Sequence, residues 1–190
     1  MDDLLDGEWL ARYERLGYLP YWANVWPAAL GLARWILRHE DFTGMDVLDL
    51  GCGVGLAGVA AGLRGARVTF ADLDPDALEF ARFNAECNGV TETRTVRLDW
   101  GHQTVPGRFD VLLLADVAYE RAHHEPLLRH VRSCREPGGR VLLGDPYRDI
   151  ANCFLGLVEK EFLVMAYDDE AHEDAKRVPL RIVDIREPHA

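Results

Sequence analysis

The chain has 190 residues, of which 48% are hydrophobic and 28% charged, which is typical of a soluble globular protein with one domain and a sizeable core. Its formal net charge of −11, without any basic cluster, argues against a nucleic-acid partner. No apolar stretch approaches the length of a membrane span, and the acidic start Met1-Asp2-Asp3 is unlike a signal peptide, so we expect a cytoplasmic protein with no membrane partner.

The four cysteines are scattered along the chain. Cys52, Cys87, Cys134 and Cys153 show no C-x-x-C spacing. Reduced thiols are therefore expected in place of disulfides or a zinc site, and no metal is predicted.

The N-terminal part combines helix signals with aromatic residues. Helices are predicted over Asp6–Leu16 and Ala28–Arg38 from their apolar faces. The stretch between them, Pro20–Pro27, is unusually aromatic for a surface loop. These aromatic side chains either cap the core or form the wall of a ligand pocket, and the second interpretation makes Trp26 part of a cofactor site.

A nucleotide-type cradle is predicted next. The apolar run Asp46–Leu50 suits a buried parallel strand, and the run Leu56–Leu63 suits a helix. Gly51, Gly53 and Gly55 lie between them. Glycine lets the backbone approach a ligand closely, and a helix N-terminus offers unpaired N–H groups to an anionic group.

Two ligands compete for this cradle. Residues 53–58 spell the dinucleotide pattern G-x-G-x-x-G, which alone is weak evidence. Asp49, at the strand tip, would repel a pyrophosphate. It suits S-adenosylmethionine (SAM), whose ammonium and sulfonium groups are cationic. The cradle therefore favours SAM, with a purely structural glycine turn as the remaining alternative.

The next two strands also end in carboxylates. Asp72 follows the predicted strand Ala66–Ala71, about 20 residues past the glycines, where a ribose hydroxyl pair would be held. Asp74 precedes a proline and is expected to cap the following helix. Alternatively, both aspartates only cap and turn the chain.

A third strand, Arg94–Leu98, leads to Asp99 and Trp100. A carboxylate can accept a hydrogen bond from the amino group of adenine, and an indole gives that ring a stacking face. The alternative is that this tryptophan belongs to the core.

The fourth strand, Phe109–Leu114, is apolar apart from Asp110 and precedes Asp116 and Tyr119. A helix over Ala122–Cys134 follows, and a turn containing two glycines leads into a strand over Arg140–Leu143.

The last part of the chain is expected to form a helix and a hairpin. The helix is predicted over Ile150–Lys160, and the two strands over Phe162–Tyr167 and Val178–Ile185. No helix separates these strands, so they should pair. The acidic run Asp168–Asp174 between them is interpreted as a solvated loop.

Together these elements predict a doubly wound α/β fold, with a mostly parallel seven-stranded sheet and one antiparallel strand. We expect one domain over residues 1–190, in which residues 1–40 cover the site and residues 41–190 form the SAM-binding core. Such folds bind ligands at the carboxyl edge of the sheet. Four strand-tip carboxylates are expected to meet in that crevice: Asp49, Asp72, Asp99 and Asp116.

The glycine stretch resembles the first motif of class I SAM-dependent methyltransferases. Three further stretches are similar to the seven-strand protein lysine methyltransferases: Tyr21-Trp22-Ala23 with Trp26-Pro27, Leu98-Asp99-Trp100-Gly101, and the D-x-x-Y signature of Asp116-Val117-Ala118-Tyr119. Gly144-Asp145-Pro146 resembles the branch that modifies the β subunit of electron transfer flavoprotein. The sequence departs from that branch at Tyr147, where a smaller residue is expected.

The resemblance implies methyl transfer from SAM to a lysine amine of a protein, with electron transfer flavoprotein β subunit as a candidate partner. Asp116 would orient the amine and Tyr119 would narrow its approach to the methyl group. No nucleophile–base pair is needed, so the histidines, including His123 and His124, are expected at the surface. A small-molecule N-methyltransferase and a SAM-binding module without activity remain alternatives, whereas a nicotinamide oxidoreductase would need a further catalytic domain.

Overall fold

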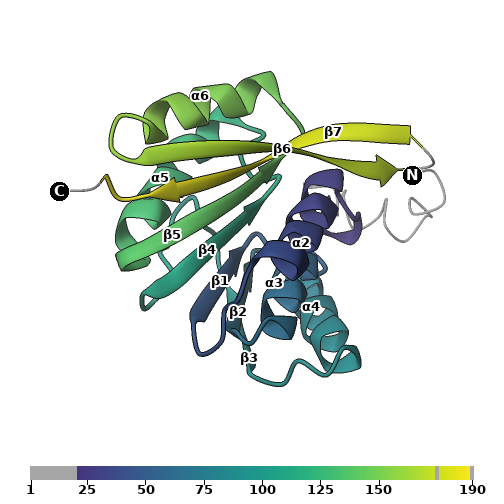
Figure 1. Ribbon diagram of the computed structural model, residues 1–190. Coiled ribbons are helices and arrows are strands. Elements are labelled where there is room, and N and C mark those ends of the chain that lie inside the picture. Colours follow the sequence, from purple (N-terminus) through teal and green to yellow (C-terminus); the bar gives the residue numbers. More distant parts are fainter. Residues whose placement is uncertain (1–20, 174–175, 189–190) are drawn as a thin grey trace, which may run out of the picture.

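The computed structural model describes residues 21–173 and 176–188, which form a single twisted sheet with helices on both faces (Figure 1). The strand order is β3-β2-β1-β4-β5-β7-β6, and β7 alone runs against its neighbours. This is the predicted mostly parallel sheet of seven strands with one reversed strand. The strands are β1 (Asp46–Leu50), β2 (Arg67–Asp72), β3 (Thr93–Arg97), β4 (Phe109–Ala115), β5 (Arg135–Asp145), β6 (Leu163–Glu173) and β7 (Lys176–Arg186).

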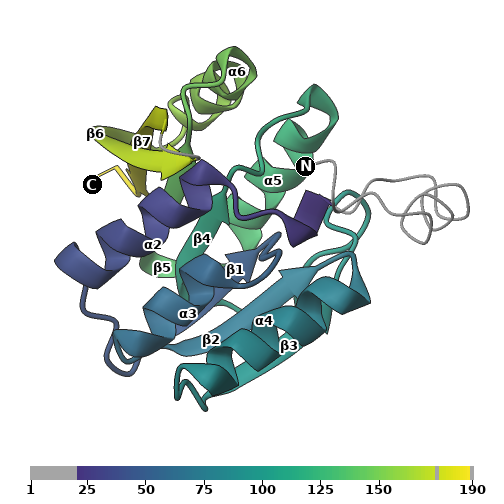
Figure 2. The same cartoon turned by 90° about the vertical axis from the view of Figure 1, so that its right-hand side faces the viewer.

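Helices cover the two faces of the sheet as separate layers. Figure 2 shows α2, α3 and α4 side by side on one face, whereas α5 and α6 lie on the other. Their bounds are α2 (Pro27–His39), α3 (Leu56–Leu63), α4 (Pro75–Cys87), α5 (Arg121–Ser133) and α6 (Asp149–Val158), after a short 3₁₀ turn η2 (Tyr21–Ala23). The helix predicted over residues 6–16 lies outside the described residues. No described helix is long and apolar enough to cross a membrane.

The two layers explain why β4 is apolar from Val111 to Ala115. Successive side chains of a strand point to opposite faces. Val111 and Leu113 therefore belong to the core under α2, α3 and α4, while Leu112 and Leu114 belong to the core under α5 and α6. Because both faces are buried, the strand has no polar face.

The bounds of β1 and α3 match the predicted ones, and most others differ by one or two residues, as helix and strand ends commonly do. The strand β5 is longer than predicted. It begins at Arg135, and its register with β4 shifts between the pairs Phe109–Arg135 and Val111–Arg140. The glycine-containing turn predicted before the strand is therefore a bulge within it.

The prediction of an acidic loop over residues 168–174 was wrong. Residues 168–173 belong to β6 and pair with β7, where Asp168 faces Arg181 and the guanidinium of Arg177 forms an ion pair with Glu170. Ala171 and Leu180 are fully buried in the core next to α2. Cross-strand charge pairs and this apolar contact stabilise a hairpin that the acidic composition of one strand concealed.

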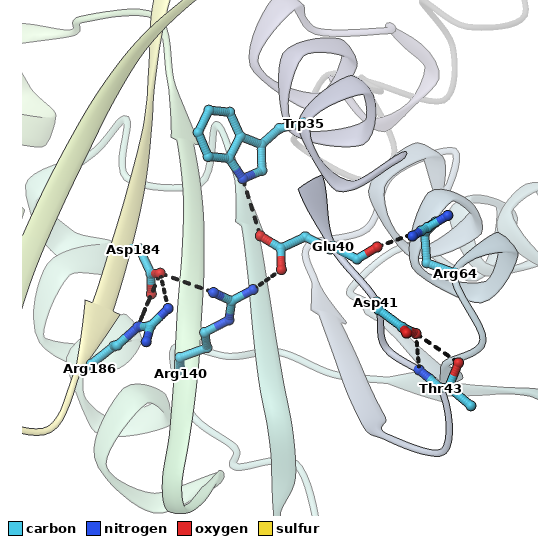
Figure 3. Close-up of polar contacts among 8 residues, drawn as sticks. All are labelled: Trp35, Glu40, Asp41, Thr43, Arg64, Arg140, Asp184 and Arg186. Carbon is cyan, nitrogen blue, oxygen red and sulfur yellow. Dashed lines mark hydrogen bonds and ion pairs between the residues drawn. The ribbon is translucent and has the colours of Figure 1, made fainter. Parts of the chain in front are cut away.

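A buried ionic cluster joins α2 to the C-terminal hairpin through Arg140 in the middle of β5 (Figure 3). The guanidinium of Arg140 pairs with Glu40, at the end of α2, and donates to Asp184 of β7 over 3.0 Å. Trp35 Nε1 donates to Glu40 over 3.2 Å, and Arg186 donates to Asp184 over 2.8 Å. Both carboxylates are largely buried, and Arg140 compensates the charge of each, while Arg186 also pairs with Asp184.

Candidate active site

A pocket of about 360 Å³ lies at the carboxyl ends of the strands, where the strand order reverses between β1 and β4. Ligands of doubly wound folds bind at this switch point. Eight of the ten predicted site residues line it: Trp26, Gly51, Gly53, Asp72, Asp99, Trp100, Asp116 and Tyr119.

The floor of the pocket is the glycine turn between β1 and α3. Gly51 has φ of 70°, and a Cβ atom there would lie 2.3 Å from the ring of Trp100. A side chain at this position would therefore displace the indole. Gly53, with φ of 51°, donates its N–H to Asp72 Oδ2 over 2.9 Å. The turn is thus shaped by glycine and fastened to the tip of β2.

Asp49 and Gly55 do not line the pocket. Of the four strand-tip carboxylates expected in one crevice, three therefore lie there: Asp72, Asp99 and Asp116. Asp49 is 1% exposed, and its Oδ2 accepts from the N–H of Gly58 in the first turn of α3 over 2.8 Å. Burial, with a contribution from Asp72, raises the pKa of Asp49 to about 7. A Cβ atom on Gly55 would lie 2.7 Å from that of Ala81. Both residues therefore serve the packing of α3.

The two aspartates after β2 have different contacts. Asp72 accepts the N–H of Gly53 with one oxygen and that of Asp74 with the other, over 3.1 Å. Burial raises the pKa of Asp72. Asp74 caps α4 as predicted, accepting from the N–H of Asp76 over 2.9 Å. Asp74 also lines the pocket.

Asp99 and Trp100 form the opposite wall. Asp99 accepts from the N–H of Gly101 over 3.0 Å and lies 2.9 Å from His102 Nδ1. The hydrogen bond from His102 holds the pKa of Asp99 below its usual value. The ring of Trp100 meets that of His123 edge-on, with 5.6 Å between centroids.

Asp116 lies at the tip of β4 and is buried. Its backbone has φ of 55°, a conformation that residues other than glycine rarely adopt. Arg148, directly before α6, donates to both carboxylate oxygens, from Nε over 2.7 Å and from Nη2 over 2.8 Å. Arg148 was not among the site residues predicted from the sequence. The available signal was that Arg148 follows β5. Because β5 pairs in parallel with β4, the residues after the two strands lie near each other.

Tyr119 and His123 complete this side of the pocket. Their rings meet edge-on, with 5.3 Å between centroids. Burial raises the pKa of Tyr119, so the phenol stays protonated at neutral pH. The expectation of surface histidines was wrong for three of them. His123 lines the pocket, His124 is 4% exposed beside the carbonyl of Ala118, and His130 is fully buried beside the carbonyl of Pro126.

The N-terminal aromatic residues form part of the pocket wall. Trp26 Nε1 donates to the carbonyl of Tyr21 over 2.9 Å, and both residues line the pocket. Trp22 is buried and its ring packs against Phe80 of α4, with 5.4 Å between centroids. The two interpretations of this stretch therefore apply together, because its aromatic side chains both cover the core and wall the pocket.

The lining is strongly acidic. None of its described residues is lysine or arginine. Five of them have carboxyl groups: Asp72, Asp74, Asp99, Asp116 and Glu120. Such a pocket favours a cationic ligand with hydroxyl or amino groups to donate, and it disfavours a pyrophosphate. In the described part of the chain, no group of three or more histidine, cysteine or acidic residues is arranged to hold a metal ion.

The fold is that of class I methyltransferases. N-methyltransferase NodS from Bradyrhizobium japonicum WM9, solved with S-adenosyl-L-homocysteine, matches with a TM-score of 0.70 at 15% identity, over 97% of this chain and 100% of that chain.

Sequence comparisons then define the family. The model of the lysine methyltransferase family matches residues 20–165, and the chain belongs to this family. It is 37% identical over 132 residues to the electron transfer flavoprotein beta subunit lysine methyltransferase of Danio rerio, covering 68% of this chain and 51% of that protein. It is 33% identical over 159 residues to protein N-lysine methyltransferase METTL21A of Mus musculus, covering 78% of this chain and 72% of that protein. The chain thus spans about half the length of the Danio rerio relative.

Proposed function

We propose that the chain transfers a methyl group from SAM to a lysine side-chain amine of a protein. The observation that carries this proposal is that Asp116 and Tyr119, the ends of the D-x-x-Y signature, line the same pocket as the glycine turn and Asp72. One cavity therefore offers both a cofactor cradle and an acceptor site. Membership of the lysine methyltransferase family supports the choice of acceptor.

The residues present fit SAM. The absence of a side chain at Gly51 and Gly53 leaves backbone exposed at the pocket floor. Asp72 would hold the ribose hydroxyls, because two of its lone pairs accept backbone N–H groups and the others remain available. Asp99 and Trp100 would hold the adenine. When bound, SAM supplies an electrophilic methyl group on a sulfonium.

The acceptor side needs no nucleophilic residue, because the amine itself attacks the methyl group. A carboxylate offers about four acceptor sites, of which Arg148 takes two, so Asp116 can still accept the N–H groups of an incoming amine. Tyr119 and Trp26 narrow the approach and limit the access of water. Catalysis then comes from holding donor and acceptor in line.

Electron transfer flavoprotein β subunit is the first acceptor to test, because a relative that is 37% identical is named for it. A cytoplasmic location stays a prediction from the sequence.

The proposal is tested in two steps. Calorimetry should show binding of SAM and of S-adenosylhomocysteine, and no binding of NAD. Radiolabelled SAM should then label purified electron transfer flavoprotein β subunit, or another protein of a cell extract, on lysine. NAD binding without SAM binding would contradict the methyltransferase assignment. Label that appears only on small molecules would contradict the protein acceptor.

A further inference from the structure

Arg148 contacts a residue of the proposed acceptor site but is not among the described residues that line the pocket. Asp116 lines the pocket, and the exposed fraction of its side chain is 4%. Arg148 reaches the same carboxylate, contacts both oxygens, and is not among the described lining residues. The guanidinium of Arg148 therefore compensates the carboxylate of Asp116 without itself being part of the described lining.

The backbone around this ion pair is under strain on both sides. Within the described residues, two that are not glycine have positive φ: Asp116, at 55°, and Tyr147, at 57°, directly before Arg148. The Tyr147 hydroxyl donates to Asp168 of β6, and Arg181 of β7 lies over the Tyr147 ring, 5.2 Å from its centroid. The hairpin thus holds the loop that carries Arg148. Strain kept in place in this way is typical of functional positions.

The charges around the acceptor position explain what such a pair can do. Asp116 is paired with a cation, whereas Asp72 accepts hydrogen bonds from the neutral N–H groups of Gly53 and Asp74. Asp145, at the tip of β5, is paired with Arg181 over 2.8 Å. The ionisable groups that line the pocket on the other elements are Tyr21, Cys52, Asp72, Asp74, Asp99, Tyr119, Glu120 and His123. In this acidic setting an uncompensated carboxylate at Asp116 would bind an ammonium ion, whose nitrogen has no lone pair for the methyl group.

We propose that Arg148 is a positioning residue that neutralises Asp116, so that the acceptor site accommodates an uncharged amine as well as an ammonium ion. Asp116 then accepts the N–H groups of the amine, while Arg148 compensates its charge. In the transfer the nitrogen lone pair forms the N–C bond, and the S–C electron pair leaves with sulfur. The resulting ammonium loses a proton to solvent. This inference rests on the proposed function, because it concerns the acceptor side of that same site.

A binding experiment tests the proposal without turnover. With S-adenosylhomocysteine saturating the full chain, NMR titration would compare choline, which is permanently charged, with 3,3-dimethylbutanol, its uncharged isostere. In Arg148→Gln the ratio of choline to dimethylbutanol affinity should rise at least about tenfold above the wild-type ratio, which corresponds to one pKa unit of the acceptor. Arg148→Lys keeps the charge and should stay near the wild-type ratio.

Matched variants separate this effect from a loss of structure. Arg132 also pairs with a carboxylate through two hydrogen bonds, to Glu161, and neither of these residues is among the described pocket lining. Arg132→Gln should leave the affinity ratio unchanged. Asp116→Asn should lower the ratio, because it leaves the guanidinium uncompensated. If Arg148→Gln does not fold, the lower ratio of choline to dimethylbutanol affinity expected for Asp116→Asn still tests the proposal.

The pH dependence of methyl transfer provides a second readout. Arg148→Gln should move the acidic limb of the rate profile to higher pH by roughly one unit or more, since a bare carboxylate raises the pKa of the amine beside it. A folded Arg148→Gln protein with the wild-type affinity ratio and the wild-type limb would overturn the proposal. If wild type binds SAM but methylates no protein, the proposed function fails, while the choline comparison still decides the role of Arg148.

Discussion

The backbone N–H of Gly53 donates to the carboxylate of Asp72 over 2.9 Å, and this bond joins the glycine turn after β1 to the tip of β2. The second oxygen of Asp72 accepts the N–H of Asp74. Hydrogen bonds therefore join the turn, Asp72 and the start of α4 along the floor of the pocket.

Asp72→Ala is expected to weaken SAM binding about 10- to 100-fold, because a hydrogen bond to a charged group is worth roughly 1.5–3 kcal/mol. Calorimetry measures the change. Asp74→Ala is the control: it removes a helix cap, which should lower the free energy of unfolding by about 0.5–2 kcal/mol and affect SAM affinity less. If Asp74→Ala abolishes binding while Asp72→Ala does not, the two roles are reversed.

Asp49 should make stability depend on pH. Its pKa in the folded protein is about 7, above the value of an exposed aspartate, so the folded state binds a proton that the unfolded state has released. The stabilisation is complete below about pH 4 and is lost as pH rises to about 7.

Asp49→Asn keeps the shape and the acceptor for Gly58 but cannot titrate. The melting temperature of wild type minus that of Asp49→Asn should therefore fall between pH 5 and pH 8. Asp46→Asn is the matched control. Asp46 is exposed, and its hydrogen bond with Arg67 lowers its pKa, so the corresponding difference should stay constant over this range. A constant difference for Asp49→Asn as well would show that Asp49 is charged throughout.

Arg140→Ala is expected to destabilise the protein by about 3–5 kcal/mol, because it leaves Glu40 buried without a cationic partner, while Arg186 still pairs with Asp184. Chemical denaturation measures the change. Arg132→Ala breaks an exposed ion pair and should cost at most about 1 kcal/mol. Equal effects of the two variants would mean that the cluster at Arg140 contributes no more than a surface pair.

The sequence predicted those parts of the fold that local pattern determines. The run Asp46–Leu50 is apolar because both faces of the strand are covered, and Asp74 before Pro75 is a local cap signal. Strand-tip carboxylates could also be placed, because parallel strands end at one edge.

Orientation and long-range pairing could not be predicted in the same way. Asp49 precedes the glycines as a ligand-binding residue would, but its side chain points toward the Gly58 amide and not into the pocket. The pairing of Asp116 with Arg148 joins residues 32 positions apart and depends on two positive φ values. The strand over residues 168–173 depends on charges and packing that its partner supplies.

The direct test of the account concerns Asp116. Asn tolerates the left-handed backbone found at this position, so Asp116→Asn removes the charge with little added strain, whereas Asp116→Ala also removes the side chain. Purified electron transfer flavoprotein β subunit would be incubated with SAM and each variant, and methyl-lysine would be counted by mass spectrometry per folded enzyme. The account predicts methylation by wild type and a loss of about 100-fold or more in both variants, with SAM affinity nearly unchanged. A variant that melts at a lower temperature but retains wild-type turnover per folded molecule would contradict it.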